Sequence, residues 1–247
     1  MREKPLVTVI TVSFNSEETI ARTVESVLAQ TYDKVEYIVM DGFSTDNTVP
    51  IVESYRPRFE EKGYRFKVIS ELDQGMYDAL NKGVAMAEGE VIGQINSDDW
   101  YEPNAVERMV DTYLEKDFDV FWADLRILKR TGPMIKRAKY NNFMTTRHWN
   151  HPTTFIRASV YKTNPYELRS MCDDFELILR LHKQHRKMVV LNEVLANFTF
   201  GGMSTQKSWS ETMNRIHLRC DYYKRNGYGF VYYVDSAVME LAKYILG

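Results

Sequence analysis

Cysteine is scarce in this sequence, and long apolar runs are absent. Its 247 residues include only Cys172 and Cys220, too few for a disulfide framework, which fits a reducing cytoplasm. No stretch approaches the roughly 20 apolar residues that span a bilayer, and the chain does not begin with a charged and then apolar leader. With 44% hydrophobic and 27% charged residues, the composition predicts a globular, cytoplasmic protein.

The glycine-rich phosphate-binding motifs are also missing. Neither G-x-x-x-x-G-K-[ST] nor G-x-G-x-x-G occurs in the sequence, which excludes a P-loop and a dinucleotide-binding Rossmann site. The formal net charge is −2 and no RNA-binding motif is present, so we expect no nucleic-acid partner.

The small net charge hides an asymmetry along the chain. Residues 1–124 contain 12 basic and 25 acidic side chains, whereas residues 125–169 contain 10 basic side chains and a single acid, Glu167. Residues 170–247 are nearly balanced, with 10 basic and 8 acidic side chains. We expect the acidic part to handle a cation and the basic part an anion.

Strand and helix patterns alternate through the first half. Residues 6–12 form a β-branched run too apolar for a surface strand, so they predict a buried strand of a parallel sheet. Similar strand patterns are found at 35–40, 66–70, 91–95 and 119–123, and helical patterns run from Ser16 onward and over 46–62, 76–87 and 103–116. This alternation predicts βαβ units and a mostly parallel sheet flanked by helices.

The alternation stops after Asp124. Residues 125–150 are basic and predicted to be irregular, with a turn at residues 131–133. The later patterns predict a helix over 173–185, a strand over 188–191 and a helical tail from Trp209 onward.

Polar residues follow four of the predicted strands, at the position where ligands bind in parallel α/β sheets. These segments are residues 13–15, 41–48, 71–75 and 96–99. One such segment alone is typical of a helix cap. Four of them at one edge of a sheet indicate a binding site.

The segment Asn96-Ser97-Asp98-Asp99 contains two adjacent carboxylates. Adjacent carboxylates repel each other unless a cation lies between them, and oxygen ligands favour Mg²⁺ or Mn²⁺. Such a cation can also bridge the phosphates of a nucleotide. The alternative is that both acids only cap the helix that begins near Pro103.

These segments resemble the motifs of the family 2 glycosyltransferases. The matching residues are Val9-Ile10-Thr11-Val12-Ser13-Phe14-Asn15, Asp41-Gly42-x-Ser44-x-Asp46-x-Thr48, Asp73-Gln74-Gly75-x-Tyr77-Asp78-Ala79-x-Asn81-Lys82-Gly83, and Gly89-Glu90 followed by Asn96-Ser97-Asp98-Asp99-Trp100. They follow the family's order over residues 5 to about 205 and are most similar to enzymes that build bacterial surface polysaccharides. The resemblance implies a GT-A fold and an inverting, metal-assisted enzyme that uses a nucleotide sugar, with UDP as the expected nucleotide.

The resemblance also implies how the chain is divided. Residues 1–205 correspond to a GT-A domain, in which 1–124 form a nucleotide-sugar-binding half and 125–205 an acceptor-side half. Residues 206–247 are a C-terminal helical extension.

The donor-binding residues are likewise implied by the resemblance. Asp98, as the last member of the family's D-x-D motif, is the implied ligand of Mn²⁺ or Mg²⁺, and Asn96 replaces the first acid of that motif. Leu80 occupies a position where many relatives have arginine. The residues implied to border the donor are Thr11, Ser13, Asn15 and Asp41 at the base and ribose, Asp73, Asp78, Asn81 and Lys82 at the diphosphate and sugar, and Asn96 and Ser97 beside the metal.

A transferase needs a base that deprotonates the acceptor hydroxyl. The family's acidic pair before a helix aligns with Asp173 and Asp174, which makes Asp174 the implied base and Asp173 its neighbour. The alternative is that both acids cap that helix. His151 resembles a residue of the acceptor side, although a packed histidine is the simpler interpretation, and residues 201–204 resemble a loop that closes over the diphosphate.

We therefore expect a single displacement that moves a hexosyl or N-acetylhexosaminyl group to a saccharide or lipid-linked saccharide. A sugar nucleotidyltransferase is an alternative, but it would need a glycine-rich basic loop where residues 13–16 lie. A glycosidase fits the chemistry but not the pattern. The non-enzymatic alternative is a nucleotide-sugar-binding protein that has lost its activity, with Asn96 as its first lost acid.

The tail mixes aromatic and basic residues, a composition suited to a membrane interface. These residues are Tyr222, Tyr223, Lys224, Arg225, Tyr228, Phe230, Tyr232 and Tyr233. Packing of the tail onto the core or onto another subunit explains the same residues. The sequence thus leaves three interpretations of the tail, one of which is peripheral contact with the inner face of the membrane.

Overall fold

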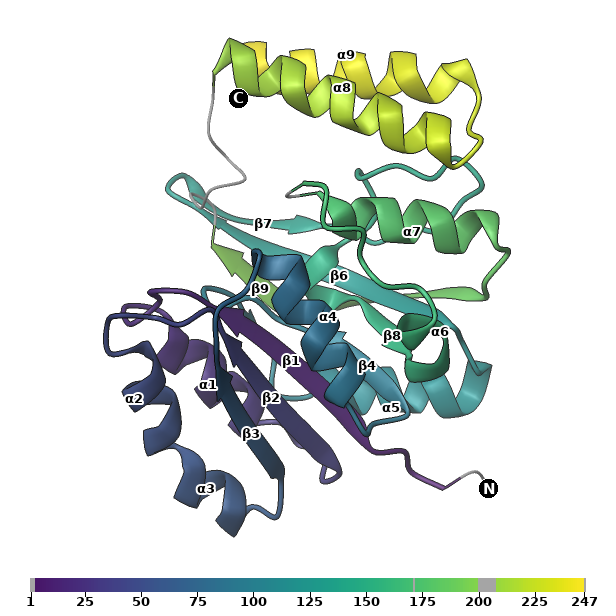
Figure 1. The fold of residues 1–247 in the computed structure, drawn as a ribbon. Coiled ribbons are helices and arrows are strands. Elements are labelled where there is room, and N and C mark those ends of the chain that lie inside the picture. Colours follow the sequence, from purple (N-terminus) through teal and green to yellow (C-terminus); the bar gives the residue numbers. More distant parts are fainter. Residues whose placement is uncertain (1–2, 171, 200–207, 247) are drawn as a thin grey trace.

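The computed structural model describes residues 3–170, 172–199 and 208–246. Within them, nine strands form one sheet in the order β3-β2-β1-β4-β8-β6-β9-β5, with β7 paired to β6. Helices cover the sheet, and a hairpin of two long helices lies at one end of the molecule (Figure 1). The predicted α/β architecture with C-terminal helices is confirmed.

The first half of the sheet is parallel. Its strands are β1 (Val7–Ser13), β2 (Val35–Asp41), β3 (Arg65–Ser70) and β4 (Val91–Gln94). β1 pairs with β2 on one side and with β4 on the other, and β3 pairs with β2. Every residue of β1 and β2 is buried, as expected for strands covered on both faces. Parallel pairing brings the carboxyl ends of these strands to one edge.

Each face of the sheet has its own apolar core. One core contains side chains of α1 (Ile20–Leu28), α2 (Thr48–Ser54), α3 (Arg56–Glu61) and α5 (Ala105–Lys116). The other contains side chains of α4 (Met76–Met86), α6 (Ala158–Lys162), α7 (Asp173–Lys183) and α8 (Trp209–Arg225). The single helix predicted over 46–62 is instead α2 and α3, because Pro57 fits the first turn of a helix but not its interior.

The second half of the sheet is more extensive than predicted. β6 (Val120–Lys129) continues past residue 123 and forms a hairpin with β7 (Gly132–Lys136), so part of the segment predicted to be irregular is sheet. β9 (Met188–Thr199) continues past residue 191 and runs parallel to β6. The short strands β5 (Trp100–Tyr101) and β8 (Phe155–Arg157) add antiparallel pairs.

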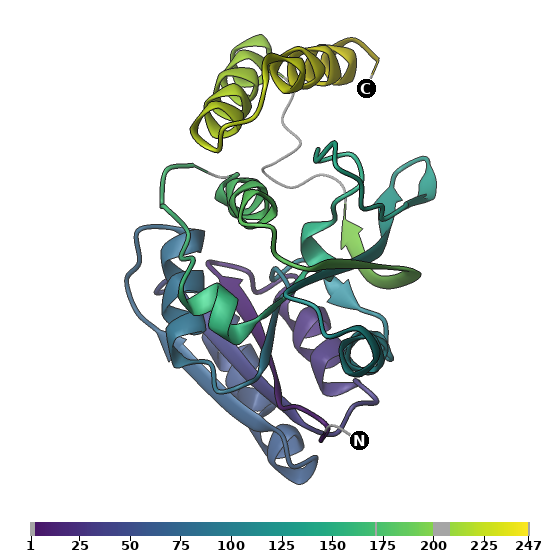
Figure 2. The same ribbon diagram turned by 90° about the vertical axis from the view of Figure 1, so that its right-hand side faces the viewer.

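The C-terminal extension packs onto the core. α8 lies next to α7, and α9 (Phe230–Leu246) packs against α8 (Figures 1 and 2). Tyr223 and Tyr228 are almost fully buried, and their hydroxyls donate to the carbonyls of Met144 and Leu179, each at 3.1 Å. Phe230 is 74% exposed. Among the residues that the structure describes, no helix combines the length and apolarity needed to cross a bilayer.

Candidate active site

Asp41 ties together the ends of the first three strands. Its buried carboxylate accepts hydrogen bonds from the Ser13 hydroxyl at the end of β1 (3.0 Å) and from the Ser70 hydroxyl at the end of β3 (2.7 Å). The backbone N–H and hydroxyl of Ser44 donate at 2.9 and 2.5 Å. The carboxylate thereby fixes the loop after β2 at the sheet edge.

Thr11 and Asn15 have different environments at the same edge. Thr11 is fully buried and accepts a hydrogen bond from the Tyr37 hydroxyl at 3.0 Å. Asn15 is exposed, has a φ of +47°, and accepts from the Thr45 backbone N–H at 2.9 Å. Of these two implied donor residues, only Asn15 presents its side chain at the surface.

The loop before α4 and the first two turns of that helix contain three of the implied diphosphate residues. Asp73 accepts from the Gly75 N–H at 2.7 Å, and Asp78 accepts from the Gln74 N–H at 3.1 Å. The Lys82 ammonium lies 3.2 Å from Asp78 and 3.0 Å from Glu71. The one cation of this group is therefore held by two carboxylates.

Asn81 is tied to the backbone of another segment. Its amide donates to the Tyr166 carbonyl at 3.0 Å and accepts from the Tyr166 N–H at 2.9 Å. This pair of bonds fixes the segment before α7 against α4, so the side chain holds two parts of the site together.

The segment after β4 separates its two carboxylates. The Ser97 hydroxyl lies 2.9 Å from that of Ser16, and the Asp98 carbonyl accepts from Arg22 at 2.8 Å. Asp98 is partly exposed, whereas Asp99 is fully buried. Burial and the neighbouring Asp98 raise the pKa of Asp99 well above its usual value. Asp98 is thus the carboxylate of the pair that a bound ion can reach.

Asp174 is held at the N-terminus of α7 by a histidine. His151 Nδ1, from the short 3₁₀ helix His151–Thr153, lies 3.0 Å from Asp174 Oδ2. The Phe175 N–H donates to Asp174 Oδ1 at 2.7 Å, and 19% of the Asp174 side chain is exposed. Burial by itself raises the pKa of Asp174, but the hydrogen bonds from His151, Phe175 and Tyr77 and the charge of His151 outweigh it and hold that pKa below its usual value.

A buried polar network lies behind this pair. Gln94, the last residue of β4, is 3.3 Å from His151 Nδ1 and bonds to the hydroxyls of Tyr161 and Tyr166. Sequence reasoning missed Gln94 as a site residue, because a glutamine in an apolar strand carries no recognisable motif. Tyr77 stood inside a matched motif and was given no role.

Asp173 has the opposite environment to Asp174. It is 1% exposed and accepts from the backbone N–H groups of Arg169 (2.7 Å) and Ser170 (3.1 Å) and from the Tyr222 hydroxyl. Its carboxylate faces the protein and anchors α8. The structure therefore brings Asp174, His151, Gln94 and Tyr77 together. Asp173 is not part of this group and instead stabilises the start of α7.

The residues around Asp98 fit a metal ion that is shared between the protein and a bound substrate. Within residues 3–170, 172–199 and 208–246, no three His, Cys, Asp or Glu side chains cluster in a way that could enclose a metal ion. Mg²⁺ in nucleotide enzymes is commonly bound by one or two carboxylates plus substrate phosphates. The partly exposed Asp98 suits that shared arrangement. The predicted loop at 201–204 lies outside the described residues.

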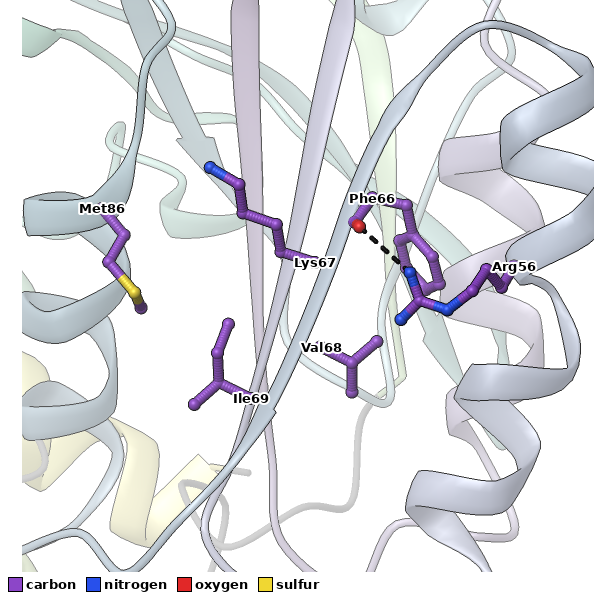
Figure 3. A pocket seen from close by; sticks show the side chains of 6 residues that line it. All are labelled: Arg56, Phe66, Lys67, Val68, Ile69 and Met86. Atoms are coloured by element: carbon purple, nitrogen blue, oxygen red, sulfur yellow. Dashed lines mark hydrogen bonds between the residues drawn. The ribbon is translucent and has the colours of Figure 1, made fainter.

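A surface pocket lies away from these residues, along the edge strand β3. Figure 3 shows Arg56 of α3 and Met86 of α4 beside it, and Arg56 donates to the Phe66 carbonyl at 3.3 Å. None of the predicted site residues lines this pocket.

Residues 8–172 match the family described as Glycosyl transferase family 2. The chain belongs to this family. An uncharacterized glycosyltransferase of Mycobacterium tuberculosis (strain H37Rv) is 39% identical over 238 residues, covering 93% of this chain and 88% of that protein. This membership confirms the resemblance seen in the motifs and sets the nucleotidyltransferase alternative aside.

Two further relatives match this chain over only a part of their own length. The putative glycosyltransferase EpsH of Bacillus subtilis is 38% identical over 110 residues, which are 44% of this chain and 31% of that protein. Chondroitin synthase of Escherichia coli is 29% identical over 210 residues, which are 79% of this chain and 30% of that protein. The chain thus spans less than a third of either relative.

Solved structures share the fold. TarS of Staphylococcus aureus in complex with UDP-GlcNAc matches with a TM-score of 0.73 and 20% identity, over 97% of this chain and 72% of that chain. A mannosyltransferase of Pyrobaculum calidifontis in complex with GDP-Man and Mn²⁺ matches with a TM-score of 0.70 and 15% identity, over 98% and 71% of the two chains. The predicted GT-A fold is confirmed.

The environment of Asp174 predicts a pH-dependent contribution to stability. Because the folded-state pKa lies below that of the unfolded chain, near 3.9, the carboxylate stabilises the fold above that pH, and this stabilisation is lost as the pH falls through the folded-state pKa. Asp174→Asn should therefore lower the free energy of unfolding at pH 7 and lower it less at pH 3, which lies below the pKa of the unfolded chain. Urea unfolding at both pH values measures the difference.

The matched control is Asp111→Asn, which removes a carboxylate that is 57% exposed on α5. We expect this variant to change stability little at either pH. If Asp174→Asn lowered the free energy of unfolding equally at pH 7 and pH 3, the stabilisation by Asp174 would not be electrostatic in origin.

Proposed function

We propose that this chain transfers a hexosyl or N-acetylhexosaminyl group from a UDP-sugar to an acceptor hydroxyl, with inversion, in the synthesis of bacterial cell-surface polysaccharide. The observation that carries the proposal is the ionised, partly exposed Asp174, held by His151 next to the end of β4. Chondroitin synthase and the UDP-GlcNAc complex of TarS support the choice of donor and pathway by similarity.

Asp174 acts as the base in this mechanism. It accepts the proton of the acceptor hydroxyl while the new bond forms between that oxygen and the anomeric carbon of the donor. The bond between the anomeric carbon and the diphosphate oxygen breaks in the same step, and the nucleoside diphosphate leaves with the electron pair. A single displacement from the opposite face inverts the anomeric centre.

His151 and Tyr77 position the base. Their hydrogen bonds orient the Asp174 carboxylate and keep it ionised at neutral pH, so that it is ready to take a proton. Gln94, which is bonded to the hydroxyls of Tyr161 and Tyr166, lies beside the same ring nitrogen of His151 at 3.3 Å.

Asp98 is the residue that would hold a divalent cation, Mn²⁺ or Mg²⁺. When bound there with the donor phosphates, the ion supplies positive charge that stabilises the departing diphosphate. Asn15 and Asp73 lie in strand-end loops and Lys82 lies on α4, and all three are proposed to border the donor. The non-catalytic alternative is a protein with the same donor site that transfers nothing.

Replacement of the base separates these alternatives. Asp174→Asn should reduce transfer about 10²–10⁴-fold, because the site then lacks the base that takes the proton of the acceptor hydroxyl. The affinity for UDP should be nearly unchanged. The assay combines UDP-Glc, UDP-GlcNAc and GDP-Man with Mn²⁺ and a panel of p-nitrophenyl glycosides, and follows nucleoside diphosphate release and the anomeric configuration of the product.

Wild-type protein that binds UDP but releases no diphosphate with any donor would support the non-catalytic alternative. Full activity of Asp174→Asn would remove Asp174 from its proposed role. Asp111→Asn serves as the control for the loss of one carboxylate.

Asp98 should control metal-dependent donor binding. We expect Asp98→Ala to weaken UDP binding about tenfold or more in Mn²⁺, which is about 1.4 kcal/mol or more, and to change it little in EDTA. Calorimetric titration in both buffers measures the effect. Equal UDP affinity of Asp98→Ala and Asp111→Ala in Mn²⁺ would refute this role.

We also propose that the tail makes peripheral contact with the inner face of the membrane. What supports this is a set of exposed apolar residues along α9: Phe230, Val231, Val234, Val238 and Ile245. Apolar side chains on one face of a helix suit the headgroup boundary. The contact would keep the active site beside lipid-linked acceptors.

Loss of this apolar surface should release the protein from lipid. Val234→Glu with Val238→Glu should abolish co-sedimentation with vesicles of phosphatidylglycerol and phosphatidylethanolamine, whereas Asn214→Glu on the exposed part of α8 should not. Absence of wild-type co-sedimentation, or equal binding by the double variant, would refute the contact.

A further inference from the structure

Gln94 connects the proposed base to a buried polar network. It is the last residue of β4 and only 4% exposed. Its Nε2 donates to the Tyr166 hydroxyl at 2.9 Å, and its Oε1 accepts from the hydroxyls of Tyr161 and Tyr166, each at 3.1 Å. The two hydroxyls lie 2.5 Å apart. Both ends of the Gln94 amide are therefore next to hydroxyls, which can either donate or accept a hydrogen bond.

His151 Nδ1 has two polar neighbours. Asp174 Oδ2 lies 3.0 Å from it, and Gln94 Nε2 lies 3.3 Å from it. An ionised carboxylate only accepts hydrogen bonds, so Nδ1 carries a proton whenever it is bonded to ionised Asp174. An amide nitrogen only donates, so it suits an Nδ1 that carries no proton. The ionised base and the amide nitrogen thus require opposite states of the same ring nitrogen.

Rotation of the Gln94 amide removes this conflict. A half-turn exchanges its nitrogen and oxygen, and the hydroxyls of Tyr161 and Tyr166 can bond the amide in either orientation. With the oxygen toward the ring, the network stabilises a proton on His151 Nδ1 beside an ionised Asp174. With the nitrogen toward the ring, as in the structure, it stabilises the same proton on Asp174, which is then no longer a base.

We propose that Gln94 is a positioning residue whose amide determines where the proton between His151 and Asp174 lies. This inference rests on the transferase function proposed above. The proton moves from Asp174 Oδ2 to His151 Nδ1, and no other bond is formed or broken. With the amide oxygen toward the ring, Asp174 stays ionised in weakly acidic solution, even when the imidazole carries a proton on each nitrogen. The base then remains ready for the proton of the acceptor hydroxyl.

Other ionisable side chains surround the pair. They are Tyr77, Tyr161, Tyr166, Cys172, Asp173 and Lys136. Burial raises the pKa of each of these tyrosines and of the Cys172 thiol, so they stay protonated in weak acid. Burial lowers the pKa of Lys136 to about 8, so its ammonium is also charged there. Asp173 accepts from the Tyr222 hydroxyl and from two backbone N–H groups. The shared proton of Asp174 and His151 is therefore the one that Gln94 controls.

Gln94→Met tests the proposal, because methionine is similar in length and offers no strong hydrogen-bonding group. The acid limb of the pH profile of kcat should move to higher pH by about one unit, the size expected when one hydrogen bond to a charged group is lost. The assay is diphosphate release with the donor and acceptor that the wild type uses.

The matched control is Gln30→Met. Gln30 is 1% exposed, and its amide donates to the carbonyls of Ser26 and Glu102 at 2.9 and 2.8 Å, away from the proposed base. This variant should lower stability and leave the acid limb where the wild type has it. A merely structural role of Gln94 predicts the same behaviour for Gln94→Met.

Nitrogen-15 NMR of the wild-type protein supplies a test that does not depend on the folding of Gln94→Met. The His151 signals are identified among those of the five histidines by their absence from His151→Gln. Nδ1 of His151 should carry a proton throughout the pH range of full activity.

Two outcomes would overturn the proposal: a wild-type Nδ1 without a proton in that range, or a folded Gln94→Met whose acid limb coincides with that of the wild type. Failure of the transferase function is recognised separately, because the wild type would then release no diphosphate with any donor, whereas the NMR measurement needs no turnover.

Discussion

Parallel pairing of β1 with β2 and β4 is the constraint on which the site depends. These strands are buried on both faces, so their register is fixed by the two apolar cores rather than by surface contacts. Their carboxyl ends meet at one edge, and the buried carboxylate of Asp41 binds the ends of three strands there. A rigid edge lets loops of very different sequence hold polar groups in a common place.

Asp173 and Asp174 are adjacent in the first turn of α7, but their carboxylates have different environments and different roles. Successive side chains on a helix point about 100° apart, so Asp173 faces the protein and anchors Tyr222 while Asp174 faces His151 and the strand edge. Both benefit from the positive end of the α7 dipole. The same geometry connects the C-terminal helices to the proposed base, because Tyr222 of α8 is hydrogen-bonded to Asp173, the neighbour of Asp174.

The sequence predicted the elements whose pattern is local, and missed features that tertiary contacts decide. The strands through residue 95 and the helices over 76–87 and 173–185 follow from apolar periodicity, and the family's motifs identified the strand-end loops. The extent of β6 was missed because its charged residues obscure the strand pattern and are satisfied by partners from other segments, as Arg126 is by Glu102 and Asn197. The burial of Asp99 and Asp173 also could not be predicted, since the sequence of two neighbouring acids does not show which one faces solvent.

The structure explains part of the charge asymmetry between residues 1–124 and 125–169. Several cations of residues 125–169 pair with acids of the first 124 residues: Arg157 with Asp117 and Asp119, Arg126 with Glu102, and Arg137 with Asp124. Much of the opposite charge of the two halves therefore joins them together and is not available to ligands.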